Sequence, residues 1–224
     1  MSSPAHLPAQ PPALLRPRLR GVSHQYAFFF SLVCGVLLVA LAGRAHARAA
    51  LIIYACAVSG LLGTSALYHR VTWKPAARRW MRRLDHSMIF VLIAATYTPI
   101  AVLALHGSLA RIVLWVVWAG ALAGVAFKLV WIDAPKWLIA GTYVALGWVA
   151  AATVGQLPGA IGWLGVAGIA AGGALYSAGA VIYALRRPDP WPGTFGYHEV
   201  FHALVIAAAA LHYAVIAFAV APRA

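Results

Sequence analysis

The stretch Gly196-Tyr197-His198-Glu199-Val200-Phe201-His202 decides the fold, because it opens the last apolar segment of the chain. The apolar residues 203–220 that follow approach the ~20 residues that a membrane-spanning helix needs. His198 and His202 are four residues apart, so a helix places both imidazoles on one face, one turn apart. Ionisable groups at membrane depth are costly and usually functional. The pair therefore predicts two ligands of a metal site at the mouth of a spanning helix.

The composition of the whole chain indicates an integral membrane protein. Of 224 residues, 63% are hydrophobic and 9% are charged, and the mean hydropathy is +0.84. Soluble domains are nearer half apolar and a quarter charged. The formal charge of +13 comes from short basic clusters between apolar runs. This pattern is typical of membrane topology rather than of a nucleic-acid-binding surface.

Seven apolar runs predict an all-α fold, a bundle of seven transmembrane helices over residues 21–224. Residues 1–20 are rich in Pro and polar residues and are expected to be a disordered basic tail. The boundaries are least well marked at residues 22–25 and 157–162. Each run is near the length of one span, and the runs cover residues 26–43, 49–68, 84–105, 112–131, 137–154, 163–185 and 198–220.

The basic residues give the expected orientation of the bundle. With the N-terminus inside, thirteen of the 17 Lys and Arg residues fall on the cytoplasmic side. Cytoplasmic loops carry an excess of Lys and Arg. We therefore expect a cytoplasmic N-terminus and a C-terminus outside. The basic residues expected on the outer side are Arg44, Arg48, Arg111 and Arg223.

The same topology brings a third histidine to the pair. The run 49–68 descends to the cytoplasmic face and is followed by His69, at the face where His198 and His202 begin the last span. His69, His198 and His202 could supply three nitrogens to one ion. Three protein ligands with an open fourth position are typical of catalytic zinc, while imidazole also suits copper, iron and nickel. The alternative is a polar network between helices without a metal.

Asp85 and Ser65 are the candidate catalytic residues. The chain has only four acidic residues, and Asp85 and Glu199 fall among the proposed ligands. We assign Asp85 to orient a water molecule and accept its proton. Ser65 lies one turn before His69 on the same helix face, and it is expected to hydrogen-bond the water or the reacting carbonyl. The alternative for Asp85 is a salt bridge with Arg82 or Arg83.

Other histidines and one motif admit different interpretations. His198-Glu199-x-x-His202 matches the metalloprotease motif, in which the Glu is the general base. Intramembrane proteolysis would need a further carboxylate ligand from another helix, so we rank it second.

The other histidines have simpler expected roles. His212 is expected to make a buried hydrogen bond to a neighbouring helix, and His86 to be a neighbour of the site. Interfacial or packing roles are expected for His6, His24, His46 and His106.

Three motifs together resemble the hemolysin III family, the bacterial branch of the progestin and adiponectin receptor superfamily, more distantly related to the alkaline ceramidases. They are Ser65-x-x-x-His69, Leu84-Asp85-His86-Ser87 leading into Ala95-Thr96-Tyr97-Thr98-Pro99, and His198-Glu199-Val200-Phe201-His202. The resemblance covers about residues 20–220. The segment Val22-Ser23-His24-Gln25 keeps a His but lacks the acidic residue and Asn that commonly precede it.

This resemblance implies seven helices, a cytoplasmic N-terminus and a location in the bacterial plasma membrane. It also implies zinc held by His69, His198 and His202 near the cytoplasmic face, with Ser65 and Asp85 close to the water on the zinc. Members are described as suspected or demonstrated lipid amide hydrolases, and the bacterial branch is named for cytolytic, pore-forming activity.

Two hypotheses follow from these residues. The first is a zinc-dependent hydrolase of a lipid amide or ester, with a membrane lipid as substrate reached from within the bilayer. The second is a non-enzymatic cytolysin or membrane-homeostasis protein with a structural zinc. A closed fourth metal position argues for structure and an open one for chemistry. Against pore formation, no span carries a continuous polar face or a ring of charges.

Overall fold

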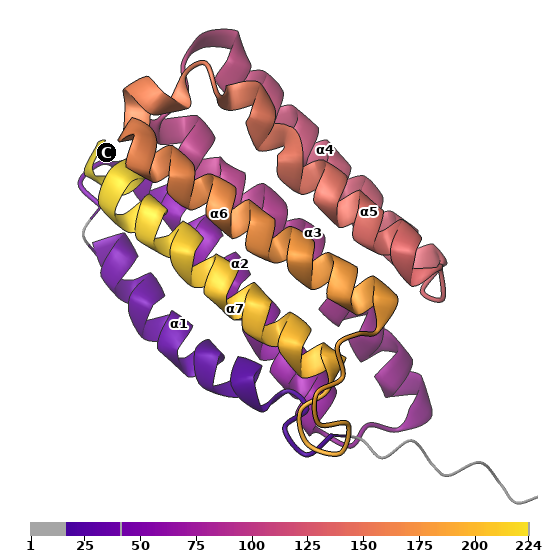
Figure 1. Cartoon of the computed structure of the whole chain (residues 1–224). Coiled ribbons are helices and arrows are strands. Elements are labelled where there is room, and N and C mark those ends of the chain that lie inside the picture. The colour runs from indigo at the N-terminus through magenta and orange to yellow at the C-terminus, as the bar shows by residue number, and fades with distance from the viewer. Residues whose placement is uncertain (1–16, 41, 224) are drawn as a thin grey trace, which may run out of the picture.

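The computed structural model describes residues 17–40 and 42–223, and these residues form a bundle of α-helices (Figure 1). The all-α prediction is confirmed. The predicted tail, residues 1–20, lies outside the described residues except for residues 17–20. In chain order the seven α-helices of the described residues are α1 Val22–Ala40, α2 Ala45–Arg70, α3 Pro75–Leu103, α4 Gly107–Val130, α5 Lys136–Gly147, α6 Leu157–Leu185 and α7 Tyr197–Val215.

Six of the described helices, all except α5, are long and apolar enough to cross a membrane, and η2 (Ile216–Val220) extends the last of them. This length fits the ~20 residues that a bilayer requires. The fifth predicted span, residues 137–154, is divided between the 12-residue helix α5 and the 3₁₀ helix η1, Trp148–Thr153. The protein is thus a multi-pass helical membrane protein whose fifth segment changes helix type along its length.

The junction between α5 and η1 is held by Tyr97 of α3. Its hydroxyl donates a hydrogen bond to the carbonyl oxygen of Gly147 and accepts one from the backbone N–H of Ala150 at 2.6 Å. Backbone groups that leave the α-helical pattern have no water to bond in a bilayer, and each unpaired group is costly there. One phenol therefore satisfies both groups and allows the helix type to change.

Helix α6 contains a kink near its start. Gly162 has φ 70° and ψ 165°, a conformation that residues with a side chain rarely adopt. The uninterrupted part of α6 therefore begins after Gly162 and agrees with the predicted run 163–185. Residues 157–161 form a separate helical turn that packs in the core.

Helix α3 begins at Pro75 rather than at the predicted Leu84. Proline suits the first turn of a helix, where its missing N–H has no partner to lose. The added turns are basic, so a search for apolar runs does not find them. Arg82 forms an ion pair with Asp133 at 2.7 Å, and Arg83 Nε donates to the Leu129 carbonyl at 3.0 Å. These bonds tie the first turns of α3 to the end of α4 and to the connection that follows it.

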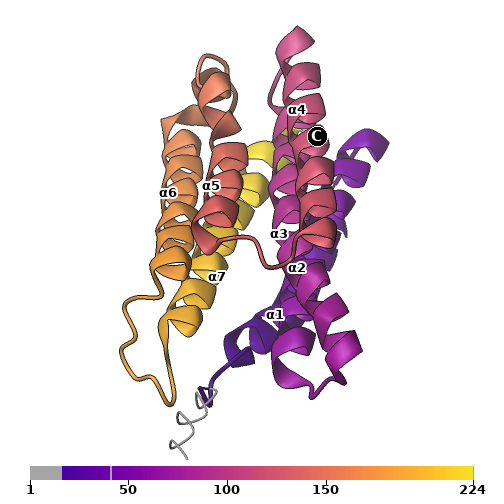
Figure 2. The same ribbon diagram turned by 90° about the vertical axis from the view of Figure 1, so that its right-hand side faces the viewer.

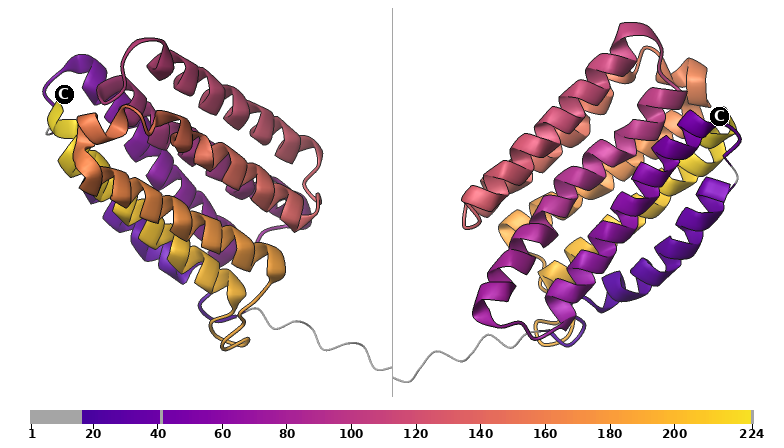
Figure 3. Two further views of the ribbon diagram at one scale, coloured as in Figure 1. Left: turned by 45° about the horizontal axis from the view of Figure 1, so that its top comes forward. Right: turned by 180° about the vertical axis from the view of Figure 1, so that it is seen from behind.

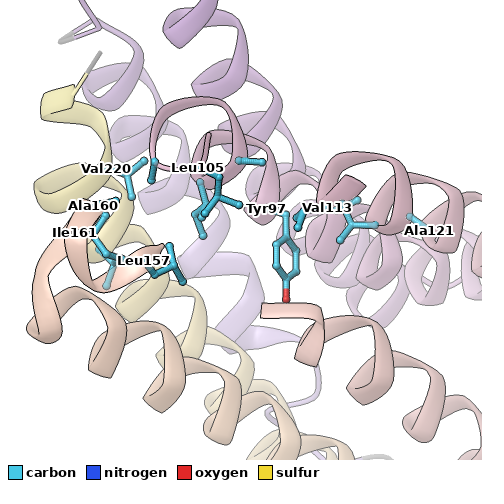
Figure 4. Packing of buried hydrophobic residues seen from close by; sticks show 14 of the residues in the cluster. Tyr97, Leu105, Val113, Ala121, Leu157, Ala160, Ile161 and Val220 are labelled. Atoms are coloured by element: carbon cyan, nitrogen blue, oxygen red, sulfur yellow. The ribbon is translucent and has the colours of Figure 1, made fainter. Parts of the chain in front are cut away.

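The helices pack in two groups. From behind, α1, α2, α3 and α4 lie side by side in that order (Figure 3), and the turned view separates them from α5 and α6 (Figure 2). Helix α6 packs on α7, and α7 also contacts α1. A buried apolar cluster, which includes Phe90, Val113, Leu157 and Val220, joins α3, α4 and α6 to the end of the chain (Figure 4).

Glycines allow close contacts between these helices. A Cβ on Gly124 would collide with the ring of Phe90, and one on Gly172 would collide with the ring of His212. Small residues at such positions let membrane helices approach closely. The two sequence pairs with four-residue spacing, Gly120 with Gly124 and Gly168 with Gly172, therefore mark real helix contacts.

The starts of α1, α3, α5 and α7 and the ends of α2, α4 and α6 lie at one end of the bundle (Figure 1). We call this the basic end. The opposite end carries Arg44, Arg48 and Arg111 beside α2 and α4. The predicted asymmetry of charge is thus an asymmetry between the ends of the bundle. The described Lys and Arg residues of the basic end are Arg18, Arg20, Arg70, Lys74, Arg78, Arg79, Arg82, Arg83, Lys128, Lys136, Arg186 and Arg187.

Candidate metal centre

Three histidine side chains meet at the basic end of the bundle. His69 is the penultimate residue of α2, and His198 and His202 lie in the first two turns of α7. The Nε2 atoms of His69 and His198 are 3.1 Å apart, and one ligand nitrogen from each of the three rings lies within 4.8 Å of the others. All three side chains are buried. The predicted trio, which we call the His cluster, is therefore brought together.

The donor set fits a metal ion. Zinc binds imidazole nitrogen at 2.0–2.1 Å, so two nitrogens on a tetrahedral ion lie roughly 3.3 Å apart. The 3.1 Å separation of the His69 and His198 nitrogens is close to this value. Nδ1 of His202 is buried and has no hydrogen-bond partner among the described residues. Neutral imidazoles in a buried group are ligands that borderline divalent ions prefer, so the His cluster could hold a metal ion.

Asp85 and Ser65 lie beside the His cluster. Oδ2 of Asp85 is 4.0 Å from Nε2 of His69. Ser65 and Asp85 line the same end of the cavity that opens from the His cluster. Arg82 pairs with Asp133, so Asp85 remains directed to the His cluster rather than to the basic turns of α3. The carboxylate is thus close enough to act on a molecule that approaches the three nitrogens.

A fourth imidazole, that of His24 on α1, packs against the His cluster. Its ring is stacked on that of His202, with centroids 3.8 Å apart and planes inclined by 9°. His24 is buried, and neither of its ring nitrogens has a hydrogen-bond partner of normal geometry in the described part of the chain. An interfacial or packing role was predicted for His24. His24 does pack, and its partner is the candidate ligand His202. The sequence signal that could have indicated this contact is the histidine kept in residues 22–25.

Residues 17–21 cover the His cluster from the basic end. The backbone N–H groups of Arg18 and Leu19 donate to the carbonyls of Gly193 and Thr194, both at 3.1 Å. Gly21 has φ +78° and lies directly against the side chain of His69. A side chain at Gly21 would collide with the histidine, so the close approach requires glycine.

Glu199 is occupied away from the His cluster. Its carboxylate forms an ion pair with Arg20 and accepts a hydrogen bond from the backbone N–H of Gly196 at 2.9 Å. The second contact caps the start of α7. A general base must reach the water that it activates, so these contacts disfavour the metalloprotease interpretation and give Glu199 a structural role.

His86 and His212 lie where the sequence predicted them, beside the site and in a bond between helices. His86 Nε2 lies 3.3 Å from the Tyr183 hydroxyl, and His86 is outside the group of three candidate ligands. His212 Nε2 donates to the Ile169 carbonyl on α6 at 3.1 Å, as expected for a buried bond between helices. His46 and His106 are exposed, and His6 lies outside the described residues.

A cavity of about 420 Å³ extends from the His cluster into the bundle, lined mainly by α3, α5, η1, α6 and α7. Ser65, Asp85, His198 and His202 line one end of it. Most of the remaining lining is apolar, with Ile89, Val144 and other aliphatic residues. Ligand sites combine such apolar walls with a few convergent polar groups. The arrangement suits an amphiphile whose polar end reaches the His cluster.

The fold and the site together define a multi-pass helical membrane protein with a buried three-histidine cluster that could hold a metal ion. Residues 13–213 match the Haemolysin-III related family. The chain belongs to this family, and the resemblance found in its motifs is confirmed.

Curated relatives include proteins of bacteria, animals and a plant. The chain is 30% identical over 184 residues to Hemolysin-3 of Bacillus cereus, covering 81% of this chain and 80% of that protein. It is 26% identical over 195 residues to the human Monocyte to macrophage differentiation factor, covering 85% and 79%. It is also 48% identical over 58 residues to the Adiponectin receptor protein of Drosophila melanogaster, a match that covers 24% of this chain and 12% of that protein. No solved structure matches the chain.

Proposed function

We propose that this protein is a zinc-dependent hydrolase of an amide or ester bond in a membrane lipid. The observation that carries the proposal is the position of the His cluster, Asp85 and Ser65 along one end of a large apolar cavity. The cavity provides room for an acyl chain, and the polar end provides groups that hydrolysis requires. We further propose that the basic end faces the cytoplasm of a bacterial cell, since Lys and Arg accumulate on that side of plasma-membrane proteins.

Zinc is the ion that we propose for the His cluster. His69, His198 and His202 are the residues that would hold it, and three histidines form a known set of catalytic zinc ligands. Zinc held there supplies a Lewis acid that lowers the proton affinity of water and polarises a carbonyl.

The protein side chains supply the remaining functions. The Asp85 carboxylate, 4.0 Å from His69, accepts the proton that the attacking water loses. Ser65, which lines the cavity beside Asp85, hydrogen-bonds the reacting carbonyl and stabilises the negative charge that develops on its oxygen. The apolar cavity fixes the acyl chain and excludes bulk water, which strengthens the electrostatic interactions at the polar end.

A second candidate is a non-enzymatic protein in which the metal is structural. Relatives carry the name Hemolysin-3, so a cytolysin or membrane-homeostasis protein is the form that this candidate takes. The specific observation in its favour is the closeness of Asp85 to the His cluster. A carboxylate that binds the metal directly would close the fourth position and leave no place for substrate.

The deciding experiment is the metal content of the purified, detergent-solubilised chain, compared with His202→Ala and Asp85→Ala. We expect about one zinc per chain in the wild type, as for a single tetrahedral site. The metal should be lost in His202→Ala and largely kept in Asp85→Ala, while hydrolysis of lipid amides should be lost in both.

Two results would contradict the proposal. Absence of metal from well-folded wild-type protein would leave the His cluster as a polar network between helices. Loss of zinc in Asp85→Ala together with intact folding would make Asp85 a direct ligand and favour the structural candidate.

A further inference from the structure

The polar side chains that line the cavity beyond the His cluster are nearly all bonded to the protein itself. Thr96 donates to the Leu92 carbonyl at 2.7 Å, and Thr153 donates to that of Ala150 at 2.6 Å. Trp148 donates to Ser177, which in turn donates to a backbone carbonyl. Tyr176 is different, because its hydroxyl has no hydrogen-bond partner among the described residues although the side chain lines the cavity.

Tyr176 lies on the face of α6 that lines the cavity. Ile169, Tyr176 and Tyr183 are seven residues apart, two helical turns, and all three line the cavity. Because side chains of a helix point toward its N-terminus, the phenol of Tyr176 is directed away from the His cluster. It reaches the level of His212 on α7, where the two ring centroids are 5.5 Å apart.

His212 gives the position of Tyr176 relative to the His cluster. It follows His202 by ten residues of α7, which corresponds to about 15 Å along the helix axis. The His212 ring is held by its bond to the Ile169 carbonyl and by contact with Gly172. The free phenol of Tyr176 thus lies beside the fixed ring of His212, roughly 15 Å deeper in the cavity than the candidate metal ligands.

The charge around Tyr176 determines which groups suit it. Asp85 is the one Asp, Glu, Lys or Arg residue among the described residues that line the cavity, and it lies at the His-cluster end. An anionic or cationic group placed near Tyr176 would have no counter-ion and would be costly to bury. A neutral group that gives and accepts hydrogen bonds, such as a hydroxyl, matches the phenol.

We propose that Tyr176 forms a second binding subsite, which hydrogen-bonds a hydroxyl on the chain of a lipid amide or ester whose carbonyl lies at the His cluster. The position of the carbonyl rests on the proposed function, whereas the free phenol in the cavity does not. An extended chain advances about 1.2 Å per bond, so the hydroxyl would lie roughly 12 carbons from the carbonyl. The subsite therefore selects hydroxylated chains of defined length over plain ones.

The test is competitive binding to the full-length chain in lipid nanodiscs, with a fluorescent long-chain amide as the displaced probe. Three amides of equal chain length are compared: one with a hydroxyl about 12 carbons from the carbonyl, one with it roughly 6 carbons away, and one without a hydroxyl. We expect the first to bind about three- to tenfold more tightly than the others, the range of one hydrogen bond. Tyr176→Phe should abolish this preference.

Tyr213→Phe is the matched control, because its hydroxyl donates to the Cys34 carbonyl on α1 and Tyr213 is not among the residues that line the cavity. It should keep the wild-type preference. Equal binding of the three amides to the wild type, no displacement by any of them, or a preference that survives Tyr176→Phe would overturn the subsite.

Hydrolysis is followed in the same samples by quantifying released fatty acid. A hydroxyl preference without product would refute the proposed hydrolase and support the subsite. Product without a preference would support the hydrolase and refute the subsite.

Discussion

The two ends of the cavity use polar side chains in opposite ways. At the basic end, the His cluster and Asp85 direct their polar atoms toward one another, and a nitrogen of His202 is left without a hydrogen-bond partner in the described chain. At the far end, Tyr97 and Thr153 direct theirs to backbone groups where the helix type changes, and the free phenol of Tyr176 is the exception among these deeper polar side chains. Polar groups that bond backbone maintain the fold, whereas convergent buried side chains are available for a ligand. The direction of each side chain thus separates structural from functional polar residues within one cavity.

His69→Ala should strongly reduce metal binding at the basic end and leave the structure of the far end unchanged. Removal of one of three imidazoles should lower zinc affinity by more than about 100-fold, because even residues that only hydrogen-bond a metal ligand contribute roughly 10–100-fold. Zinc competition with a chelating dye measures the change. The helical content by circular dichroism should remain that of wild type, and unchanged zinc affinity would remove His69 from the site.

Tyr97→Phe should have the opposite effect, lower stability with unchanged zinc affinity. It leaves the Gly147 carbonyl and the Ala150 N–H without their phenol partner, so we expect a loss of about 1–3 kcal/mol in stability. Thermal unfolding in nanodiscs measures this loss. Zinc affinity should stay within about twofold of wild type, since no metal ligand is touched. A selective fall in zinc affinity would show that the two ends are coupled.

His24 sharpens the comparison, because its contact with the basic end is a ring stacked on His202. His24→Ala should weaken zinc binding about two- to tenfold, as expected for loss of an aromatic pair worth roughly 0.5–1.5 kcal/mol. His24→Phe keeps a ring without nitrogens and should restore most of the affinity. If phenylalanine were as damaging as alanine, the imidazole nitrogens of His24 would have to take part.

Tyr54 gives the smallest expected effect. Its hydroxyl is buried on α2 without a hydrogen-bond partner in the described chain and lies outside the cavity lining. Tyr54→Phe removes an unsatisfied polar group, so we expect a stability increase of up to about 1 kcal/mol. Thermal unfolding measures the increase, and Phe90→Tyr adds a buried hydroxyl as the opposite control. A destabilised Tyr54→Phe protein would indicate that its hydroxyl has a partner, such as a buried water.

Sequence reasoning was most successful where one helix carries its own signal. Apolar length located the spans, and the four-residue spacing of His198 and His202 predicted a shared face. The alternation of spans brought His69 and Asp85 to the same end. These predictions need only helix geometry and topology.

The features that were missed depend on contacts between distant segments. The end of α5 at Gly147 depends on Tyr97, fifty residues earlier in the chain. The stacking of His24 on His202 requires α1 and α7 to be neighbours, which no periodicity within either segment reveals. The contact of Glu199 with Arg20 has the same origin, and it changes how a familiar motif is interpreted.

The docking of residues 17–21 and His24 against α7 has a consequence for biosynthesis. Membrane chains are made from the N-terminus, so α1 and α2 exist before α7 leaves the ribosome. Until then His69 lacks both partner histidines, His24 lacks the ring that it stacks on, and Arg20 lacks Glu199. The contacts of Arg20 and His24 with α7 therefore form only after α7 has been made. A metal ion that needs all three histidines can be captured only by a chain whose synthesis and insertion are complete.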